Sequence, residues 1–222
     1  MNVLVACEFS GRVRDAFRRR GHNAWSCDLL PTDDERTSVN IQTFHLRGNV
    51  EDVMYGNIPK HMVAHSAFRS VPMFIKWDLM IAFPPCTYLC SSGLHWNTRR
   101  PGRSLLTDRA VEFVQRLMDA PIDRIAVENP IGCLSTRIRK PDQIIQPWQF
   151  GHPESKSTCL WLKNLPMLRP TNVLQKPESG RWSNQTASGQ NRLGPSPDRW
   201  KERSKTYPGI ADAMAEQWGE RR

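Results

Sequence analysis

The sequence predicts an α/β fold in which a central, mostly parallel sheet carries helices on both faces. Short and almost wholly apolar runs at 2–7, 79–83 and 124–128 are typical of strands buried on both faces of a sheet. Helical periodicity appears at 13–20 and 107–119, between such runs. Two of the runs also stop at sharp corners, where open α/β sheets hold their functional groups.

The first unit reads as strand, glycine turn and helix, the opening of a nucleotide-binding βαβ unit. After the run at 2–7, Phe9, Ser10 and Gly11 form a tight turn, and Gly21 is expected as the left-handed cap of the helix. The turn has one glycine rather than the three of a dinucleotide fingerprint. We therefore expect a nucleoside-type cofactor that brings no phosphate to this turn.

The next two corners offer further cofactor contacts. A predicted strand at 24–27 ends at Asp28, where an acid can bind ribose hydroxyls, although a simple turn aspartate is an equal alternative. A weak strand at 43–46 precedes Asn49 and Asp52, two candidates for binding the edge of a base. Residues 60–76 are expected to form an edge helix or an insertion; the role of 57–76 stays open.

The most informative stretch of the sequence surrounds Cys86, which follows a buried strand. The run at 79–83 stops at Pro84 and Pro85, which cannot continue a sheet ladder and place Cys86 on a stiff corner. A single cysteine is more often a small buried hydrophobe. A second corner of the same kind follows, because the run at 124–128 ends in Glu128, Asn129 and Pro130. A candidate nucleophile and a candidate acid thus both lie where strands leave the sheet.

Basic residues gather after these corners. The segment after Cys86 is expected to be a mobile loop whose Arg99, Arg100 and Arg103 bind phosphates, unless it is a solvated surface loop. Residues 149–162 read as two strand-like pieces around a polar turn, with Lys156 as a candidate substrate contact; a surface hairpin at the sheet edge is the alternative.

Composition narrows the class of partner. The 222 residues carry a formal net charge of +9, which favours a polyanionic partner. Six irregularly spaced cysteines indicate reduced thiols in a cytoplasmic protein, and no apolar run approaches the ~18 residues of a membrane span. Cys86, Cys90 and His95 lack a fourth ligand, so no metal is expected.

Residues 170–205 are rich in Pro, Gly, Ser and Asn and interleave basic residues with Trp182 and Trp200. Such a mixture suits contacts with a nucleic-acid backbone and stacking on bases. We expect three parts in the chain: a catalytic domain at 1–169, a small DNA-facing region at 170–205, and a closing helix at 206–222 that packs back on the catalytic part.

The order of these motifs resembles the DNA cytosine-5 methyltransferases, and most closely their short, phage-type members. The Pro-Pro-Cys and Glu-Asn-Pro corners on successive strands carry the resemblance, which covers about 2–165 and resumes at 207–219. It implies a Rossmann-like class I fold that uses S-adenosylmethionine, with Cys86 as nucleophile and Glu128 as acid. Pro84 would then border the cofactor, and Pro85 and Asn129 the target base.

The chemistry explains these residue types. A thiolate that adds to carbon 6 of cytosine makes carbon 5 nucleophilic, and a protonated carboxyl at ring nitrogen 3 stabilises the developing charge. The expected partner is DNA, with no membrane contact and a monomer favoured, in a bacterial or phage-infected cell. RNA or a free pyrimidine nucleotide as substrate, another carbon 5 modification, and a catalytically silent nucleic-acid-binding module remain alternatives.

Overall fold

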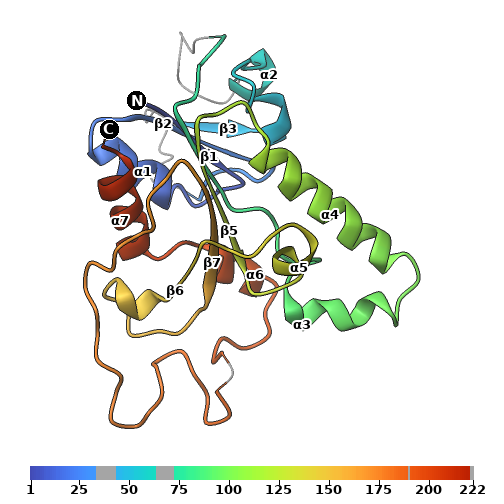
Figure 1. Cartoon of the computed structure of the whole chain (residues 1–222), viewed down its shortest axis with the longest axis vertical. Coiled ribbons are helices and arrows are strands. Elements are labelled where there is room, and N and C mark those ends of the chain that lie inside the picture. Colours follow the sequence, from blue (N-terminus) through green and yellow to red (C-terminus); the bar gives the residue numbers. More distant parts are fainter. Residues whose placement is uncertain (34–43, 64–72, 190, 221–222) are drawn as a thin grey trace.

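The computed structural model describes residues 1–33, 44–63, 73–189 and 191–220, and these contain a seven-stranded sheet. Its spatial order is β3-β2-β1-β4-β5-β7-β6 (Figure 1). Neighbours from β3 to β5 pair in parallel, whereas β7 is antiparallel to both β5 and β6. The strands are β1 (Asn2–Ala6), β2 (Asn23–Asp28), β3 (His45–Arg47), β4 (Leu79–Ala82), β5 (Arg124–Pro130), β6 (Gln143–Ile145) and β7 (Thr158–Lys163).

The chain reverses its direction across the sheet at β1. From β1 it moves outward to β2 and β3, and it then returns to place β4 on the other side of β1. This is the Rossmann-like arrangement, and it leaves a crevice between the loops that follow β1 and β4. The predicted α/β fold class is confirmed.

Helices cover both faces of the sheet because its strands alternate between two apolar cores. Val3 and Val5 of β1 pack with α1 (Arg12–Arg19) and α7 (Pro208–Trp218). Leu4 and Ala6 lie on the other face, in the core that includes α4 (Arg103–Met118). In Figure 1, α1 and α7 accordingly lie together on one side and α4 on the other.

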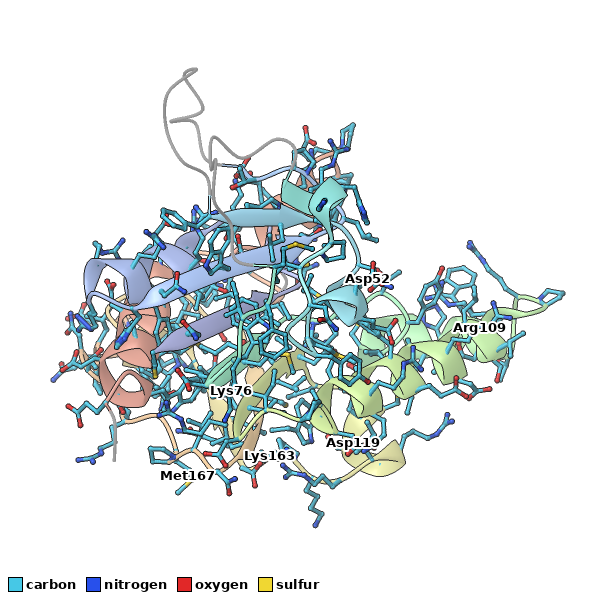
Figure 2. The ribbon with its side chains drawn as sticks, turned by 90° about the horizontal axis from the view of Figure 1, so that it is seen from above. Asp52, Lys76, Arg109, Asp119, Lys163 and Met167 are labelled. Atoms are coloured by element: carbon cyan, nitrogen blue, oxygen red, sulfur yellow. The ribbon has the colours of Figure 1, made fainter. Side chains whose placement is uncertain are left out.

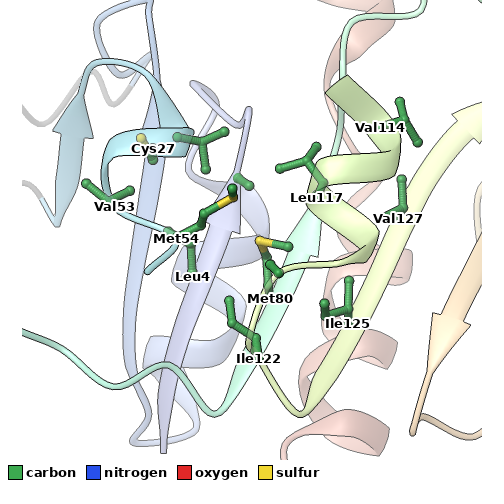
Figure 3. Packing of buried hydrophobic residues seen from close by; sticks show 14 of the residues in the cluster. Leu4, Cys27, Val53, Met54, Met80, Val114, Leu117, Ile122, Ile125 and Val127 are labelled. Carbon is green, nitrogen blue, oxygen red and sulfur yellow. The ribbon is translucent and has the colours of Figure 1, made fainter. Parts of the chain in front are cut away.

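The core under α4 is shown in Figure 3. Val114 and Leu117 of α4 lie against Met80, Ile125 and Val127 of the central strands, and all five are fully or almost fully buried. Burying such side chains contributes roughly 1.5–3 kcal/mol each. The strands β4 and β5, which lead to the Cys86 and Glu128 corners, are therefore the most firmly held part of the sheet.

The segment 60–76, expected as an edge helix or an insertion, is described only at its two ends. It begins with the short helix α2 (Lys60–Val63), and residues 64–72 lie outside the described part of the chain. Residues 73–75 are instead extended beside 56–58, because Ile58 and Ile75 donate backbone hydrogen bonds to Met73 and Gly56. The strand expected at 43–46 is β3, and Thr43 also lies outside the described residues.

The segment 149–162 was expected as two strand-like pieces, with a surface hairpin at the sheet edge as the alternative; the first piece and the hairpin are both wrong. Only its second half is a strand, β7, and it lies inside the sheet between β5 and β6 rather than at an edge. The partner is the short strand β6, which precedes the predicted piece and was not expected. Residue Gln149 belongs instead to the short helix η3 (Pro147–Gln149).

The remaining described elements are short. They are η1 (Val50–Asp52), α3 (Ser91–Leu94), η2 (His95–Asn97), α5 (Leu134–Arg137) and α6 (Arg199–Ser204). Among the residues that the structure describes, no helix has both the length and the apolar character needed to cross a membrane.

The docking of α7 depends on a glycine in its first turn. A Cβ added to Gly209 would lie 2.0 Å from the carbonyl oxygen of Phe150, and the Gly209 amide donates to His152 Nε2 at 2.9 Å. We expect Gly209→Ala to lower the free energy of unfolding by about 1–3 kcal/mol, the usual cost of overpacking. Urea unfolding measures this. Gly194→Ala, where a Cβ meets nothing within 4 Å, is the control; an equal effect of both changes would contradict the prediction.

Candidate functional site

A cavity of about 880 Å³ lies where the loops after β1 and β4 part. Its position is the crevice that Rossmann-like folds use for ligands, and its size lies within the range of small-molecule sites. Seven of the residues predicted from sequence are in its wall: Phe9, Ser10, Pro84, Pro85, Cys86, Glu128 and Lys156. The structure does not place the other predicted residues in the wall: Gly11, Asp28, Asn49, Asp52, Asn129, Arg99, Arg100 and Arg103.

The turn after β1 is organised by Glu8, which the sequence reasoning missed. Its carboxylate accepts hydrogen bonds from the backbone amides of Val13, at 2.7 Å, and Arg14, at 3.3 Å, and from the Ser10 hydroxyl. Gly11 precedes α1 with a φ of 70°, a conformation that glycine adopts without strain. The signal available in the sequence was an acid just before the start of a helix.

This capping bears on the kind of ligand that fits. The two first-turn amides of α1 that would otherwise bind a phosphate are already used by the Glu8 carboxylate. Burial raises the pKa of Glu8, whereas the Val13 amide and the positive charge of Arg14 oppose that rise. A second anion at this helix end would meet the Glu8 carboxyl, so the turn suits a ligand without phosphate.

The corners after β2 and β3 lie at the margin of the cavity. Asp28 accepts a hydrogen bond from the Leu30 amide, and Asn49 caps η1 by accepting one from the Glu51 amide. Burial raises the pKa of Cys7, a cavity residue, and the negative charges of Asp28 and Glu51 raise it further, which places both carboxylates near it. Glu51, which the sequence reasoning missed, also pairs with Arg116 of α4.

Cys86 begins a turn immediately beyond the two prolines. The amides of Leu89 and Cys90 both donate to the Cys86 carbonyl at 3.0 Å, so the chain turns sharply and Cys86 is left exposed in the cavity wall. A hydrogen bond with the Cys90 sulfur and desolvation raise the pKa of the Cys86 thiol, while the positive charge of Lys156 lowers it.

Glu128 enters the same cavity from the neighbouring strand. Val127 of β5 pairs with Ala82, the last residue of β4, so Glu128 lies level with the corner that leads to Cys86. The expectation that this strand leaves the sheet at Glu128 was wrong, because β5 continues to Pro130 by pairing with β7. Desolvation raises the pKa of its carboxyl, whereas the charge of Lys156 and a hydrogen bond from Thr158 lower it. The nearby Glu128 charge also raises the pKa of Cys86, so the acid and the thiol lie within electrostatic reach of each other.

Asn129 supports this arrangement from below the cavity wall. Its side chain is fully buried and its Nδ2 donates to the Pro84 carbonyl at 2.9 Å, which links the end of β5 to the end of β4. In the described part of the chain its Oδ1 has no hydrogen-bond partner. Such an orphaned buried acceptor is expected where a polar group arrives with a ligand.

The loops after β4 and β5 are then locked together at Gly132. The Ser91 amide donates to the Ile131 carbonyl at 3.1 Å, and the Cys133 amide to the Leu89 carbonyl at 2.9 Å. A Cβ on Gly132 would lie 1.9 Å from the Leu89 oxygen, so only glycine allows this approach. The crossing fixes the Cys86 turn relative to Glu128.

Lys156 reaches the cavity from the connection between β6 and β7. Its Nζ donates to the Arg203 carbonyl at 2.9 Å, and its backbone amide donates to Gln146 Oε1 at 3.0 Å. Its charge acts on both Cys86 and Glu128. The structure therefore brings together the thiol, the carboxyl and the lysine, which came from three separate stretches of sequence.

The segment around α6 closes one side of the cavity. From the sequence this segment was expected to face DNA, and its place in the cavity wall was not predicted. Trp200 lies against Phe9 with ring centroids 6.3 Å apart. Lys205 pairs with Asp33 at 2.6 Å, and Arg12 donates to the Thr206 carbonyl at 2.9 Å. These contacts tie the end of the chain to the turn after β1.

The three predicted arginines lie on an arm formed by α3, η2 and the start of α4, so the expectation of a loop without helices was wrong. Figures 1 and 2 show α4 reaching away from the sheet, with Arg109 on its outer part and Asp119 just beyond its inner end. Arg99 and Arg100 are exposed, and Arg100 lies over the Trp96 ring at 4.2 Å. Arg103 differs, because it is half-buried and donates to the Thr87 carbonyl beside Cys86.

In the residues that the structure describes, no group of three or more His, Cys, Asp or Glu side chains is arranged to hold a metal ion. Cys86, Cys90 and His95 accordingly do not form such a group. The site that they neighbour consists of a thiol pair, a carboxyl and an amine.

Comparisons with known proteins found a distant structural likeness and no match in sequence. No protein-family model and no curated protein matches this sequence. One solved structure with a similar arrangement is a candidate DNA modification methyltransferase encoded within a prophage of E. coli. It shares 15% sequence identity at a TM-score of 0.46, over 78% of this chain and 52% of that chain. This chain thus spans about half the length of that protein, and its function has to be argued from the site.

The burial of Glu128 gives a prediction about pH. Since folding raises the pKa of Glu128, its contribution to stability is fully present below its unfolded pKa and is lost as the pH rises through its folded pKa. Glu128→Gln removes the carboxylate but keeps the shape. We expect the variant to exceed the native protein in unfolding free energy at pH 8, on the order of 1 kcal/mol, and the gain to vanish towards pH 4.

Urea unfolding at a series of pH values measures this difference. Glu112→Gln on the outer face of α4 is the matched control, because Glu112 is exposed. A stability difference between Glu128→Gln and the native protein that is the same at every pH would contradict the prediction, because it would mean that folding does not shift the pKa of Glu128.

Proposed function

We propose that this protein transfers a methyl group from S-adenosylmethionine to carbon 5 of cytosine in DNA. The observation that carries the proposal is that Cys86 and Glu128 meet in one cavity at the crevice of the sheet, with Lys156 acting on both. A thiol nucleophile beside a carboxyl with a raised pKa suits addition to an electron-poor ring.

The cofactor side of the cavity fits a methyl donor of the nucleoside type. Phe9 and Ser10 border it, Glu8 has already used the helix amides that a phosphate would need, and Asp28 and Asn49 stand at the margin for ribose and base edges. Pro84 lies between this side and the Cys86 side. S-adenosylmethionine would supply an electrophilic methyl group on its sulfonium; no other chemistry is asked of it.

The residues of the chain account for the remaining steps. The Cys86 thiolate adds to carbon 6 of the ring, and the protonated Glu128 carboxyl donates to nitrogen 3, so the ring electrons become available at carbon 5. After methylation, carbon 5 loses its proton, the bond between carbon 6 and sulfur breaks, and Cys86 leaves as the thiolate. Asn129 holds the Pro84 carbonyl and keeps an acceptor free near the base.

Burial of Glu128 serves this chemistry. A carboxylate in water is ionised at neutral pH and cannot donate a proton, whereas desolvation raises its pKa towards the range where it can. Lys156 opposes that rise and also favours the thiolate of Cys86. Burial and Lys156 therefore act in opposite directions on both groups, together with the Cys90 sulfur at Cys86 and Thr158 at Glu128.

DNA is the substrate that the charge distribution favours. The net charge is +9, and the arm of α3, η2 and α4 presents Arg99 and Arg100 beside the loop that carries Cys86. We assign residues 1–169 to catalysis, 170–205 to a DNA-facing region and 206–222 to a closing helix. Because the reacting ring atoms are stacked inside a duplex, the target base must be flipped out or already unpaired.

The first test is product formation. Purified protein with S-adenosylmethionine and duplex DNA should yield 5-methyldeoxycytidine, detected by mass spectrometry after digestion to nucleosides. Cys86→Ala should abolish product, because the proposal assigns the bond to carbon 6 to the Cys86 sulfur, and Cys27→Ala, buried in β2 outside the cavity, should retain it. Single-stranded DNA, RNA and dCTP are parallel substrates. No product on any of them would overturn the proposal; product from Cys86→Ala would remove Cys86 as nucleophile.

The second test concerns the arm. Replacing Arg99 and Arg100 by glutamine should weaken DNA binding and lower the slope of log affinity against log salt by about 2, one unit for each lost phosphate contact. Fluorescence anisotropy at several salt concentrations measures the slope. The double change of Arg19 and Arg20 to glutamine, on the face covered by α7, removes the same charge and is the control. Equal slopes for both double variants would exclude the arm from the DNA interface.

A further inference from the structure

An exposed tryptophan lies in the wall of the cavity. Trp200 belongs to α6, it borders the cavity, and 53% of its surface is exposed. The other seven tryptophans of the chain are buried or half-buried. A large aromatic side chain left open to a cavity is a typical lining for a small-molecule site, because the ligand covers it.

Phe9 supports the Trp200 ring from one side. The two ring centroids are 6.3 Å apart and the rings are tilted by 57°. This spacing is that of a direct aromatic pair, roughly 4.5–7 Å, so no third ring fits between them. The Lys201 ammonium lies 5.7 Å from the centroid of the indole, and the indole remains half exposed in spite of both neighbours. A ligand can therefore lie on the open side of the Trp200 ring, where the ring borders the cavity.

The chain that follows α6 is tied to the turn after β1 and to the segment after β2. The Asp33 amide donates to the Phe9 carbonyl at 2.8 Å, and the Asp33 carboxylate pairs with Lys205 at 2.6 Å. Arg12, in the first turn of α1, donates to the Thr206 carbonyl at 2.9 Å. These bonds hold α6 on the side of the cavity that the proposed function gives to the cofactor.

DNA bases are the other planar rings on which Trp200 could stack, and its position argues against them. The ring contacts the turn after β1, whereas a target base has to reach Cys86 beyond the end of β4. The exposed arginines proposed to bind phosphates, Arg99 and Arg100, lie on the arm of α3, η2 and α4. Trp200 is therefore placed to meet the cofactor rather than the target strand.

The chemistry of this side also favours a nucleoside. The Glu8 carboxylate already binds the α1 amides that would attract a phosphate, so the affinity has to come from other groups. An indole face binds a planar heterocycle by stacking, without reading its hydrogen-bonding edge. Adenine is the planar group of S-adenosylmethionine, and an exposed aromatic ring is the feature that this side of the cavity offers it.

We propose that Trp200 stacks on the adenine ring of S-adenosylmethionine and that α6 completes the cofactor side of the cavity. The inference rests on the proposed function, which supplies the identity of the cofactor. It moves α6 out of the DNA-facing region expected at 170–205 and into the cofactor site. A single side chain then links the end of the chain to the turn after β1 through the ligand.

Binding of S-adenosylhomocysteine tests this, because that molecule carries the adenine but has no methyl group to transfer. In titration calorimetry, Trp200→Ala should bind it roughly 5- to 150-fold more weakly, the effect of losing one stacked base. Trp200→Phe should recover most of the affinity. Trp200→Leu keeps an apolar contact with Phe9 without an aromatic face and should bind about as weakly as Trp200→Ala. Trp96→Ala, on the arm and outside the cavity wall, is the control and should bind like the native protein.

The ring that Trp200 recognises is identified with parts of the cofactor. In displacement of labelled S-adenosylhomocysteine, Trp200→Ala should weaken adenosine by the same factor and leave methionine unchanged. Tryptophan fluorescence gives a readout of the contact itself. S-adenosylhomocysteine should quench the native protein, and most of this quenching should be lost in Trp200→Phe at a ligand concentration that saturates the variant.

Several results would overturn the proposal. Native affinity for S-adenosylhomocysteine in Trp200→Ala or Trp200→Leu would show that no ring stacks on Trp200. Unchanged affinity together with weaker DNA binding in fluorescence anisotropy would assign the tryptophan to DNA. Failure of the native protein to bind S-adenosylhomocysteine or adenosine would also exclude it. Should Trp200→Ala fail to fold, the comparison of Trp200→Phe with Trp200→Leu still decides.

The same measurements separate this inference from the proposed function. If adenosine and S-adenosylhomocysteine bind in a way that depends on Trp200, but no tested substrate receives a methyl group, the proposed function fails and the nucleoside site stands. If methyl transfer occurs and Trp200→Ala keeps its native affinity for S-adenosylhomocysteine, the proposed function stands and the role of Trp200 is excluded.

Discussion

The arrangement of the site depends on the close crossing of the loops that follow β4 and β5. The Leu89 carbonyl lies where a side chain on residue 132 would be, and two backbone hydrogen bonds cross at this point. The Asn129 side chain adds a third link by binding the Pro84 carbonyl. Since β4 and β5 are also buried on both faces, their ends are fixed before any ligand arrives. Without these links, two groups on separate loops would not keep the precise relative position that addition to a ring requires.

Two carboxyl groups in the cavity wall, Glu8 and Glu128, lose hydration on folding, and only a few neighbouring groups stabilise their charged forms. Glu8 and Glu128 are desolvated, and the chain offsets the first with helix amides and the second with Lys156 and Thr158. Lys156 is itself anchored by the Arg203 carbonyl, so the segment near α6 contributes to the electrostatics of Cys86 although it lies more than a hundred residues away in sequence. Disturbing that segment would change the protonation of the site before it changed its shape.

The sequence predicted what local patterns determine and missed what long-range contacts determine. Buried apolar runs gave β1, β4 and β5, and the helical stripes gave α1 and α4, because each has a strong local period; α7 was expected from the family resemblance. The position of β7 inside the sheet depends on pairing with β6, a strand of three residues with no readable period. Cys86, Glu128 and Lys156 were named from corners and charge, but their meeting in one cavity follows from topology. Glu8 was missed, although an acid just before a helix can be read from the sequence, because only the folded chain shows that its carboxylate binds the amides of α1 beside the cavity.

The proposed function divides DNA binding and chemistry between two parts of the molecule whose electrostatic interactions respond to different solution conditions. The arm of α3, η2 and α4 carries exposed arginines, whose attraction to phosphates falls as salt rises. The cavity groups are desolvated, so salt screens them weakly and pH controls them instead. Arg103 joins the two parts, because it begins α4 yet donates to the Thr87 carbonyl next to Cys86. The first turn of α4 is therefore tied by a hydrogen bond to the turn that carries Cys86, so the position of the arm and the position of the candidate nucleophile are not independent.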